Sequence, residues 1–342
     1  MSFAFKFLPV SDDTRPLTIA VSIAGGSGTG KTYSALLLAR GIADGKPFAV
    51  IDTENRRAVH YRNDFPEMVH VDMSPIDEAG EIVGFPPERW IAAIDAVEAQ
   101  GLPVVVIDSF SHAWEGIGGV LEMQAEELEV LMRNSSRDQS MRAWAKVKPR
   151  YRRLVERIIR AQCHVIICIR AKAMIQNPKG GNMNPNKIRR PDLPWDIACD
   201  KDLVFEMTAS LLMTPEQPGK PILLKCADVF KPMLSTGAPL TVQAGATMRE
   251  WANGADFREA KRAMDDARHI ARKGSEAMRE FWKGLSKPDA GTLRPILAEL
   301  QALARDADEE ATMDPFAASE AVEETGGVIE DGAHAAWIEE SK

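Results

Sequence analysis

The sequence predicts an α/β fold with a mostly parallel sheet flanked by helices, on the strength of three observations. A glycine-rich stretch lies between an apolar, strand-like run and a helical run. Three more short apolar runs follow along the chain, and two of them end in acidic residues. Segments with helical patterns separate these runs, which is the alternation that parallel βαβ units require.

The first element is a strand, 17–24, and the stretch that follows it, Gly25 to Thr32, reads GGSGTGKT. This stretch fits the pattern G-x-x-x-x-G-K-[ST], and the helical run that follows it ends near Gly45. In such a loop backbone N–H groups surround a phosphate, the lysine reaches the β- and γ-phosphates, and the hydroxyl ligates Mg²⁺. The alternative is a glycine-rich turn in another kind of α/β protein. The predicted nucleotide-binding residues are Gly25, Gly26, Ser27, Gly28, Thr29, Gly30, Lys31, Thr32 and Tyr33.

The next two strands end in carboxylates. A strand at 48–51 is followed by Asp52 and Glu54, and a second apolar run ends at Asp108. Ligands of open α/β sheets bind at the carboxyl ends of the strands. An apolar strand that ends in aspartate after a phosphate loop is the Walker B pattern, so Thr32 and Asp108 are the predicted Mg²⁺ ligands. The alternative for Asp108 is a strand-end cap.

Positive charge is concentrated in one segment. Residues 142–190 contain 14 Lys or Arg and one acid, although the whole chain has a net charge of −8. The spacing predicts a helix with six bases in one narrow sector, broken, kinked or restarted at Pro149. Such a sector suits a polyanion, and a solvated helix face is the alternative. The six bases are Arg142, Lys146, Arg150, Arg153, Arg157 and Arg160.

A strand at 164–169 leads into residues 171–194, which are rich in Gly, Asn, Pro and bases and therefore predict a long loop. Two more strand-like runs follow. From residue 256 two helical patterns predict a hairpin. The predicted organisation is an N-terminal lead (1–16), an ATPase core (17–254), a helical hairpin (256–305) and an acidic, disordered tail (306–342).

The composition indicates the cellular compartment in which the protein is expected to work. No stretch approaches 18 consecutive apolar residues, and the first residues lack the apolar run of a signal peptide. The four cysteines include no C-x-x-C pair. We therefore expect a cytoplasmic protein with reduced cysteines, without a zinc site and without a membrane partner.

Four motifs together resemble the RecA-like P-loop ATPases, a group of AAA family ATPases. They are GGSGTGKT, VIDTEN, VVVIDSFSHAWEG and HVIICIRAK. The resemblance extends over about 17–254 and is greatest to ATPases of bacteriophages and prophages, including the RecA-like single-strand annealing proteins. It implies a RecA-like core that uses ATP and Mg²⁺ and acts on single-stranded DNA in recombination, annealing or replication. It also implies a homo-oligomer in the cytoplasm of a bacterial host, with a phage single-strand-binding or replication protein as a candidate partner.

The resemblance also assigns roles to residues. Lys31 and Asp108 are catalytic with Glu54, the glutamate that activates water, and Glu115 is the alternative for Glu54. DNA-binding loops are implied at 115–140 and 171–194. The DNA-binding residues expected from charge and resemblance are Arg142, Lys146, Arg150, Arg153, Arg157, Lys172, Lys179, Lys187, Arg189 and Arg190.

Two features are left open by the resemblance. Where RecA has a glutamine that couples nucleotide to DNA, this chain reads Cys168-Ile169-Arg170, so another group, such as Arg170, would carry the coupling. A basic residue from a neighbouring subunit is expected to complete the site, with Lys225 and Lys231 as candidates. The competing hypotheses are a nucleotide-switched protein-binding module with little catalysis and a P-loop kinase for a small substrate.

Overall fold

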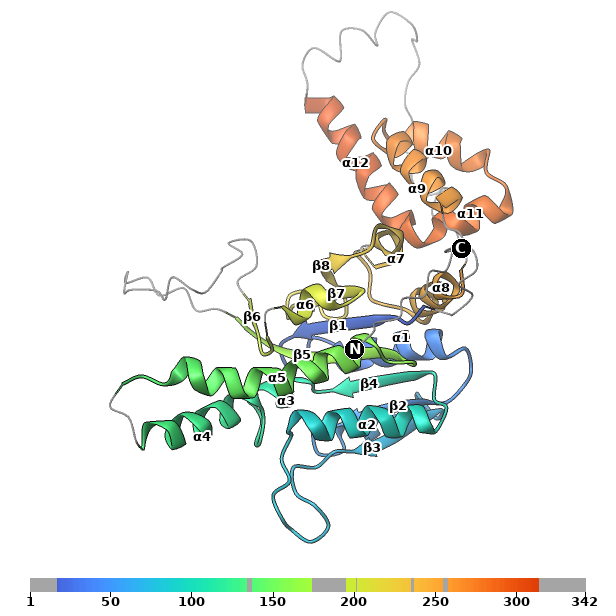
Figure 1. Ribbon diagram of the computed structural model, residues 1–342. Coiled ribbons are helices and arrows are strands. Elements are labelled where there is room, and N and C mark those ends of the chain that lie inside the picture. The colour runs from blue at the N-terminus through green and yellow to red at the C-terminus, as the bar shows by residue number, and fades with distance from the viewer. Residues whose placement is uncertain are drawn as a thin grey trace, which may run out of the picture. The chain divides into compact units, whose positions relative to one another are not determined.

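The computed structural model describes residues 17–133, 137–173, 195–200, 202–234, 237–254 and 258–313 (Figure 1). The predicted DNA-binding residues Lys179, Lys187, Arg189 and Arg190 lie outside these ranges, as does the sequence after Met313. The chain divides into two units. One comprises Met1–Ala227 with Ala238–Ala255, and the other comprises Asp228–Gly237 with Asp256–Lys342.

The first unit is built on one sheet with the strand order β3-β2-β4-β5-β1-β7-β8. The neighbouring strands from β3 to β7 are parallel, β8 is antiparallel to β7, and β6 pairs antiparallel with the end of β5. This order confirms the predicted α/β fold class. The strands are β1 (Ala20–Gly25), β2 (Phe48–Asp52), β3 (Met68–Asp72), β4 (Val104–Asp108), β5 (His164–Ala173), β6 (Trp195–Ile197), β7 (Ala209–Met213) and β8 (Ile222–Cys226).

The central strands consist almost entirely of buried apolar residues. Every residue of β2 and of β4 is buried, which is typical of parallel strands covered by helices on both faces. Parallel register then brings the strand ends together. Asp52 pairs with Asp108, Asp108 with Cys168, and Gly25 with Arg170. The residues expected to carry chemistry therefore lie at one edge of the sheet.

Helices cover both faces of this sheet (Figure 1). Helices α2 and α5 pack against each other over one face, and α1 lies on the other face with α8 packed against it. The helices of this unit are α1 (Lys31–Ala43), α2 (Pro87–Ala99), α3 (Ser111–Glu115), α4 (Val120–Met132), α5 (Ser140–Ile159), α6 (Leu203–Glu206) and α8 (Val242–Ala252). None of the helices in the described part of the chain combines the length and the apolarity needed to cross a membrane.

Pro149 lies inside α5 and does not end it, contrary to the expectation of a break or a restart. An interior proline costs a helix about 3 kcal/mol. Buried side chains on both sides of the proline outweigh this cost, because Val147 precedes it and Tyr151 and Leu154 follow it on the face that packs into the core. Tertiary packing therefore keeps one continuous helix.

Other local expectations are also corrected. Half of 115–140, expected as a DNA-binding loop, forms α4. The edge strand β3, in the segment before α2, was not predicted, because the prolines of that segment indicate irregular structure. The strand expected around 203–214 is divided into α6 and β7.

The second unit is a small helical bundle with its own core. Its elements are η3 (Asp228–Phe230), α7 (Lys231–Leu234), α9 (Arg258–Ala271), α10 (Ser275–Lys283), α11 (Lys287–Leu293), η4 (Arg294–Ile296) and α12 (Leu297–Met313). Buried Met278, Leu293 and Leu300 hold it together, and Arg268 Nε donates to Glu299 Oε1 at 2.8 Å. The sequence predicted only a hairpin, because the turns between short helices resemble one polar linker. Helix α12 also continues past the predicted boundary at residue 306.

Helices α1 and α8 approach so closely that their contact requires glycine. A Cβ atom on Gly41 would lie 2.0 Å from the carbonyl oxygen of Val242, and one on Gly245 would lie 2.3 Å from that of Leu38. Real Cβ atoms do not approach backbone oxygen so closely. The two helices could accommodate a larger residue only by moving apart, and α1 carries the glycine loop at its N-terminus.

We therefore predict that Gly41→Ala lowers the free energy of unfolding by about 1–3 kcal/mol, the usual cost of overpacking. Urea unfolding followed by circular dichroism measures the change. Gly291→Ala is the matched control, since Gly291 lies within α11 and a Cβ there meets open space. Equal stability of the two variants would contradict the tight α1–α8 contact.

Candidate nucleotide site

A cavity of about 450 Å³ lies at the carboxyl ends of the strands, a volume in the range of small-molecule sites. It brings the glycine loop together with Glu54 and Asp108, as the sequence predicted. The residues that line it are Gly25, Ser27, Gly28, Gly30, Lys31, Thr32, Glu54, Arg57, Tyr61, Asp108, Arg170, Ala171 and Lys172.

The glycine loop has the conformation that its sequence requires. Gly28 and Gly30 have φ angles of 77° and 88°, in the left-handed region that favours glycine. The loop is braced by Thr29, whose hydroxyl donates to Gly26 O at 2.9 Å and whose carbonyl accepts from Gly219 N at 2.8 Å. Helix α1 begins at Lys31 without a side-chain cap, so its first N–H groups are available to an anion.

Lys31 and Thr32, at the start of α1, make different contacts. The Lys31 ammonium donates to Gly26 O at 2.6 Å, and burial lowers its pKa against the opposing effect of nearby carboxylates. The Thr32 hydroxyl donates to Asp108 Oδ2 at 2.6 Å. Burial raises the pKa of Asp108, and the Thr32 hydrogen bond opposes that rise.

The Thr32 hydroxyl and the Asp108 carboxylate form a pair of adjacent oxygen ligands. Among the described residues, no group of three His, Cys, Asp or Glu side chains is placed to hold a metal ion. This donor set fits Mg²⁺, which proteins usually bind through one or two side-chain oxygens together with substrate phosphates and water. A magnesium ion would here complete its coordination with phosphate oxygens and water.

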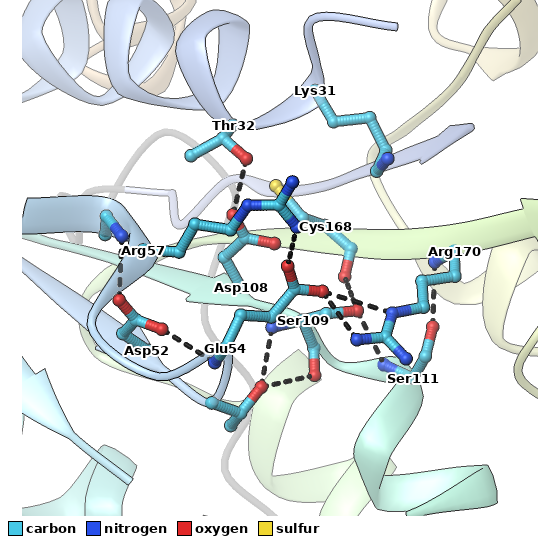
Figure 2. A network of polar contacts seen from close by, with 12 residues as sticks. Lys31, Thr32, Asp52, Glu54, Arg57, Asp108, Ser109, Ser111, Cys168 and Arg170 are labelled. Atoms are coloured by element: carbon cyan, nitrogen blue, oxygen red, sulfur yellow. Dashed lines mark hydrogen bonds and ion pairs between the residues drawn. The ribbon is translucent and has the colours of Figure 1, made fainter. Parts of the chain in front are cut away.

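Glu54 is held between two arginines (Figure 2). Its Oε1 accepts from Arg170 Nε at 3.1 Å and Nη2 at 2.8 Å, and its Oε2 accepts from Arg57 Nη1 at 2.7 Å. Burial alone would raise the pKa of Glu54, whose side chain is 14% exposed. The hydrogen bonds from Arg170 and Arg57 outweigh burial and lower the pKa, so Glu54 is ionised.

Asp52 organises the turn that carries Glu54 into the cavity. Its buried carboxylate accepts from the backbone N–H of Glu54 at 2.7 Å and of Ala58 at 2.8 Å, and its Oδ2 lies 3.2 Å from His70 Nε2. The turn passes through left-handed conformations at 55–56 and then enters η2 (Arg57–Tyr61). One buried side chain therefore places Glu54 and the start of η2 together.

A second network joins the ends of β2, β4 and β5. The Thr53 hydroxyl accepts from Ser109 N at 2.8 Å and lies 2.7 Å from His112 Nδ1. Burial, followed by the charge of Arg170, lowers the pKa of His112, which favours its neutral form. The Ser111 hydroxyl accepts from the Arg170 backbone N–H at 2.8 Å. The strand end that bears Arg170 is thus fixed to the segment that follows Asp108.

Of the two carboxylates considered as the catalytic base, only Glu54 lines the cavity of the glycine loop. Glu115 lines a separate cavity of about 690 Å³, and its Oε2 lies 3.5 Å from Lys172 Nζ. Tyr33 is 41% exposed and packs against Tyr61 and Phe65 without lining the nucleotide cavity.

Four of the six bases predicted for one sector of α5 form ion pairs within the chain. Helix α5 packs against α2 and α4, and the acids of those helices face it. Arg150 bonds Glu88 at 2.7 Å, Arg157 bonds Asp95 at 2.8 Å and Glu98 at 2.6 Å, and Lys146 contacts Glu127. The expectation of six bases free for a polyanion is therefore wrong for these three, because the sequence spacing could not show acids from other helices. It is also wrong for Arg160, whose Nη2 lies 2.6 Å from Glu156 Oε1 of the same segment.

The remaining predicted cations differ in their surroundings. Arg142 and Arg153 are exposed, and Arg142 Nη1 lies 3.3 Å from Gln139 Oε1. Lys172 lines both cavities. Lys225 donates to the Phe205 carbonyl, and Lys231 Nζ lies 2.7 Å from Asp228 Oδ1, so both candidates for a neighbour's site have contacts in their own chain.

Sequence reasoning missed Asp52, Arg57 and Tyr61 as parts of the site. Asp52 was seen only as an acid at a strand end, and nothing in its spacing indicates that it accepts backbone N–H groups. Arg57 follows the DTEN motif by two residues, but a surface arginine there would look the same in the sequence. Proximity to the glycine loop is what distinguishes it.

Comparison with known proteins agrees with this geometry. The model of the family AAA_24, described as an AAA domain, matches residues 18–209. A search of curated proteins finds no match. Among solved structures, the KaiC-like protein PH0186 from the hyperthermophilic archaeon Pyrococcus horikoshii OT3 is similar at 15% identity and a TM-score of 0.28, covering 61% of this chain and 80% of that one.

Asp52→Ala should destabilise the protein, because it leaves the buried N–H groups of Glu54 and Ala58 without their acceptor. Each such group costs about 1–3 kcal/mol, so the loss in unfolding free energy should reach at least about 2 kcal/mol. Urea unfolding provides the measurement. Asp72→Ala is the matched control, because Asp72 pairs in register with Asp52 but is exposed. A loss no larger than that of the control would refute the bracing role of Asp52.

Proposed function

The chain belongs to the AAA domain family and has a P-loop ATPase core, and we propose that it hydrolyses ATP with Mg²⁺ in order to act on single-stranded DNA. The observation that carries the nucleotide part is the single cavity in which the glycine loop, the Thr32–Asp108 pair and Glu54 meet. In this proposal the first N–H groups of α1 and Lys31 bind the phosphates.

The proposed reaction is transfer of the γ-phosphoryl group to water. The water oxygen forms a bond to the γ-phosphorus while the bond from that phosphorus to the bridging oxygen breaks. The electron pair of the broken bond remains on ADP, and a proton of the water passes to the Glu54 carboxylate. Lys31 stabilises the negative charge that develops on the phosphates. Thr32 and Asp108 would hold Mg²⁺, which neutralises phosphate charge when bound.

The DNA part of the proposal rests on the sequence resemblance and on the concentration of bases in 142–190. Arg142 and Arg153 are exposed, and Lys172 lines both cavities. These three cations, together with Lys179, Lys187, Arg189 and Arg190, are the proposed phosphate contacts. We place the activity in phage-type recombination, annealing or replication, in a homo-oligomer in the bacterial cytoplasm.

A second candidate function gains support from the ion pairs of α5. If Lys146, Arg150 and Arg157 serve only to hold α5 on its neighbours, fewer cations of α5 remain to contact the phosphates of DNA. The chain would then be a nucleotide-switched module that binds another protein. Single-stranded DNA distinguishes the two functions, because only the first predicts that DNA changes the rate of ATP hydrolysis.

We expect ATP turnover that rises when single-stranded DNA is added, and Lys31→Ala should lower turnover by about 10²-fold or more because developing phosphate charge loses its cation. Phosphate release with and without a homopolymeric oligonucleotide is the measurement. Lys46→Ala, an exposed lysine at the other end of the first βαβ unit, is the control. Turnover that DNA does not change would favour the protein-binding alternative.

Glu54→Gln should retain ATP binding and lower turnover by about 10²–10⁴-fold, because an amide cannot accept the proton of the attacking water. Equilibrium binding of a fluorescent ATP analogue, measured beside phosphate release, separates the two effects. Glu115→Gln is the paired variant. If it loses turnover and Glu54→Gln does not, Glu115 is the base.

A further inference from the structure

We propose that Arg57 and Arg170 are phosphate-binding arginines supplied by the same chain, and that they hold Glu54 until a γ-phosphate replaces it as their hydrogen-bond acceptor. The inference rests on the proposed ATP hydrolysis and identifies which cations complete the site. It replaces the expectation that a lysine of a neighbouring subunit does so.

Both arginines line the cavity and come from separately fixed parts of the backbone. Arg170 ends the parallel part of β5, where its N–H is bound by Ser111 Oγ. Arg57 begins η2, whose position is set by the bond from Ala58 N to Asp52. The side chain of Arg170 is 41% exposed and that of Arg57 is 63% exposed, whereas that of Glu54 is 14% exposed. The arginines thus have access to a ligand in the cavity while they cover the carboxylate.

Each guanidinium has donors beyond those that Glu54 uses. Arg170 gives Nε and Nη2 to Oε1, and Arg57 gives Nη1 to Oε2. The contacts described for the chain leave Nη1 of Arg170 and both Nε and Nη2 of Arg57 for another acceptor. A guanidinium binds phosphate oxygens through paired N–H donors. The same arginine can therefore exchange Glu54 for a phosphate group.

The charge of the cavity favours this exchange. Among the described residues that line it, Lys31, Arg57, Arg170 and Lys172 are basic, whereas Glu54 and Asp108 are acidic. Positive charge is thus in excess at the place where a phosphate chain would lie. A phosphate would reduce the repulsion between these cations.

This arrangement couples the state of the base to the presence of the γ-phosphate. While both oxygens of Glu54 accept from arginines, the carboxylate is stabilised as an anion, and only one acceptor position, on Oε2, is left for a water. A γ-phosphate that draws one arginine away would free an oxygen for the attacking water. ADP lacks that group and would leave Glu54 held.

The test compares Arg170→Ala, Arg170→Lys and Arg57→Ala with Arg62→Ala, an exposed arginine of the same segment that does not line the cavity. Binding of ADP and of a non-hydrolysable ATP analogue is measured with Mg²⁺, followed by ATP turnover at several protein concentrations. Thermal unfolding by circular dichroism shows which variants are folded.

The wild type should bind the analogue more tightly than ADP. Arg170→Ala and Arg57→Ala should each lose about tenfold or more of this preference, since a hydrogen bond to a charged group is lost. Arg170→Lys should keep part of it, and Arg62→Ala all of it. Turnover per chain should stay constant on dilution, since the cations are in the same chain.

The pH dependence of kcat/KM provides a second measurement, because a residue with a merely structural role would not change it. Removing Arg170 takes away a hydrogen bond that lowers the pKa of Glu54. The acid limb of kcat/KM, which reports groups of the free enzyme, should therefore move to higher pH in Arg170→Ala. It should not move in Arg62→Ala.

Three results would be decisive. Wild-type preference for the analogue in both alanine variants, with wild-type turnover, would overturn the inference. Turnover that falls on dilution and is unaffected by Arg170→Ala would also overturn it, in favour of a neighbour's cation. A wild type that binds the analogue but does not turn over ATP, with the preference lost in the alanine variants, would refute the proposed hydrolysis and leave the inference standing.

Discussion

The structure depends on the register of its parallel strands. Because β2, β4, β5 and β1 run in the same direction and are hydrogen-bonded side by side, their carboxyl ends meet at one edge. This register places Asp52 beside Asp108 and Gly25 beside Arg170, although the sequence separates them widely. Because β2 and β4 are buried on both faces, a shift by one residue would exchange the side chains that pack against the helices of each face, and a close-packed core tolerates such an exchange poorly.

Around that edge, several polar groups form hydrogen bonds with one another. Asp52 accepts from two backbone N–H groups, Thr53 links β2 to the segment after β4, and Ser111 links that segment to Arg170. In a site of low dielectric an unpaired polar group is costly, so each of these bonds restricts the positions of its neighbours. The functional side chains Glu54 and Arg170 are therefore held by a frame that does not itself face the ligand.

The Glu54 environment illustrates why an ionised carboxylate is not by itself an available base. The two arginines lower its pKa and keep it charged, yet they also occupy both of its oxygens. A change of partners, and not a change of protonation, would then determine when the carboxylate can accept a proton. The arginines that stabilise the Glu54 carboxylate are also the cations that a phosphate chain would require.

The sequence by itself determined the glycine loop, four central strands, and Glu54 and Asp108 at strand ends, because these follow from local spacing and apolar runs. Only the tertiary structure decided that Pro149 lies within one helix, that acids of α2 and α4 neutralise bases of α5, and that Arg57 and Arg170 meet at Glu54. Glu54 and Arg170 are 116 positions apart. The physical reason is that a helical or strand period reports only the face on which a residue lies, whereas its partner depends on which elements pack together.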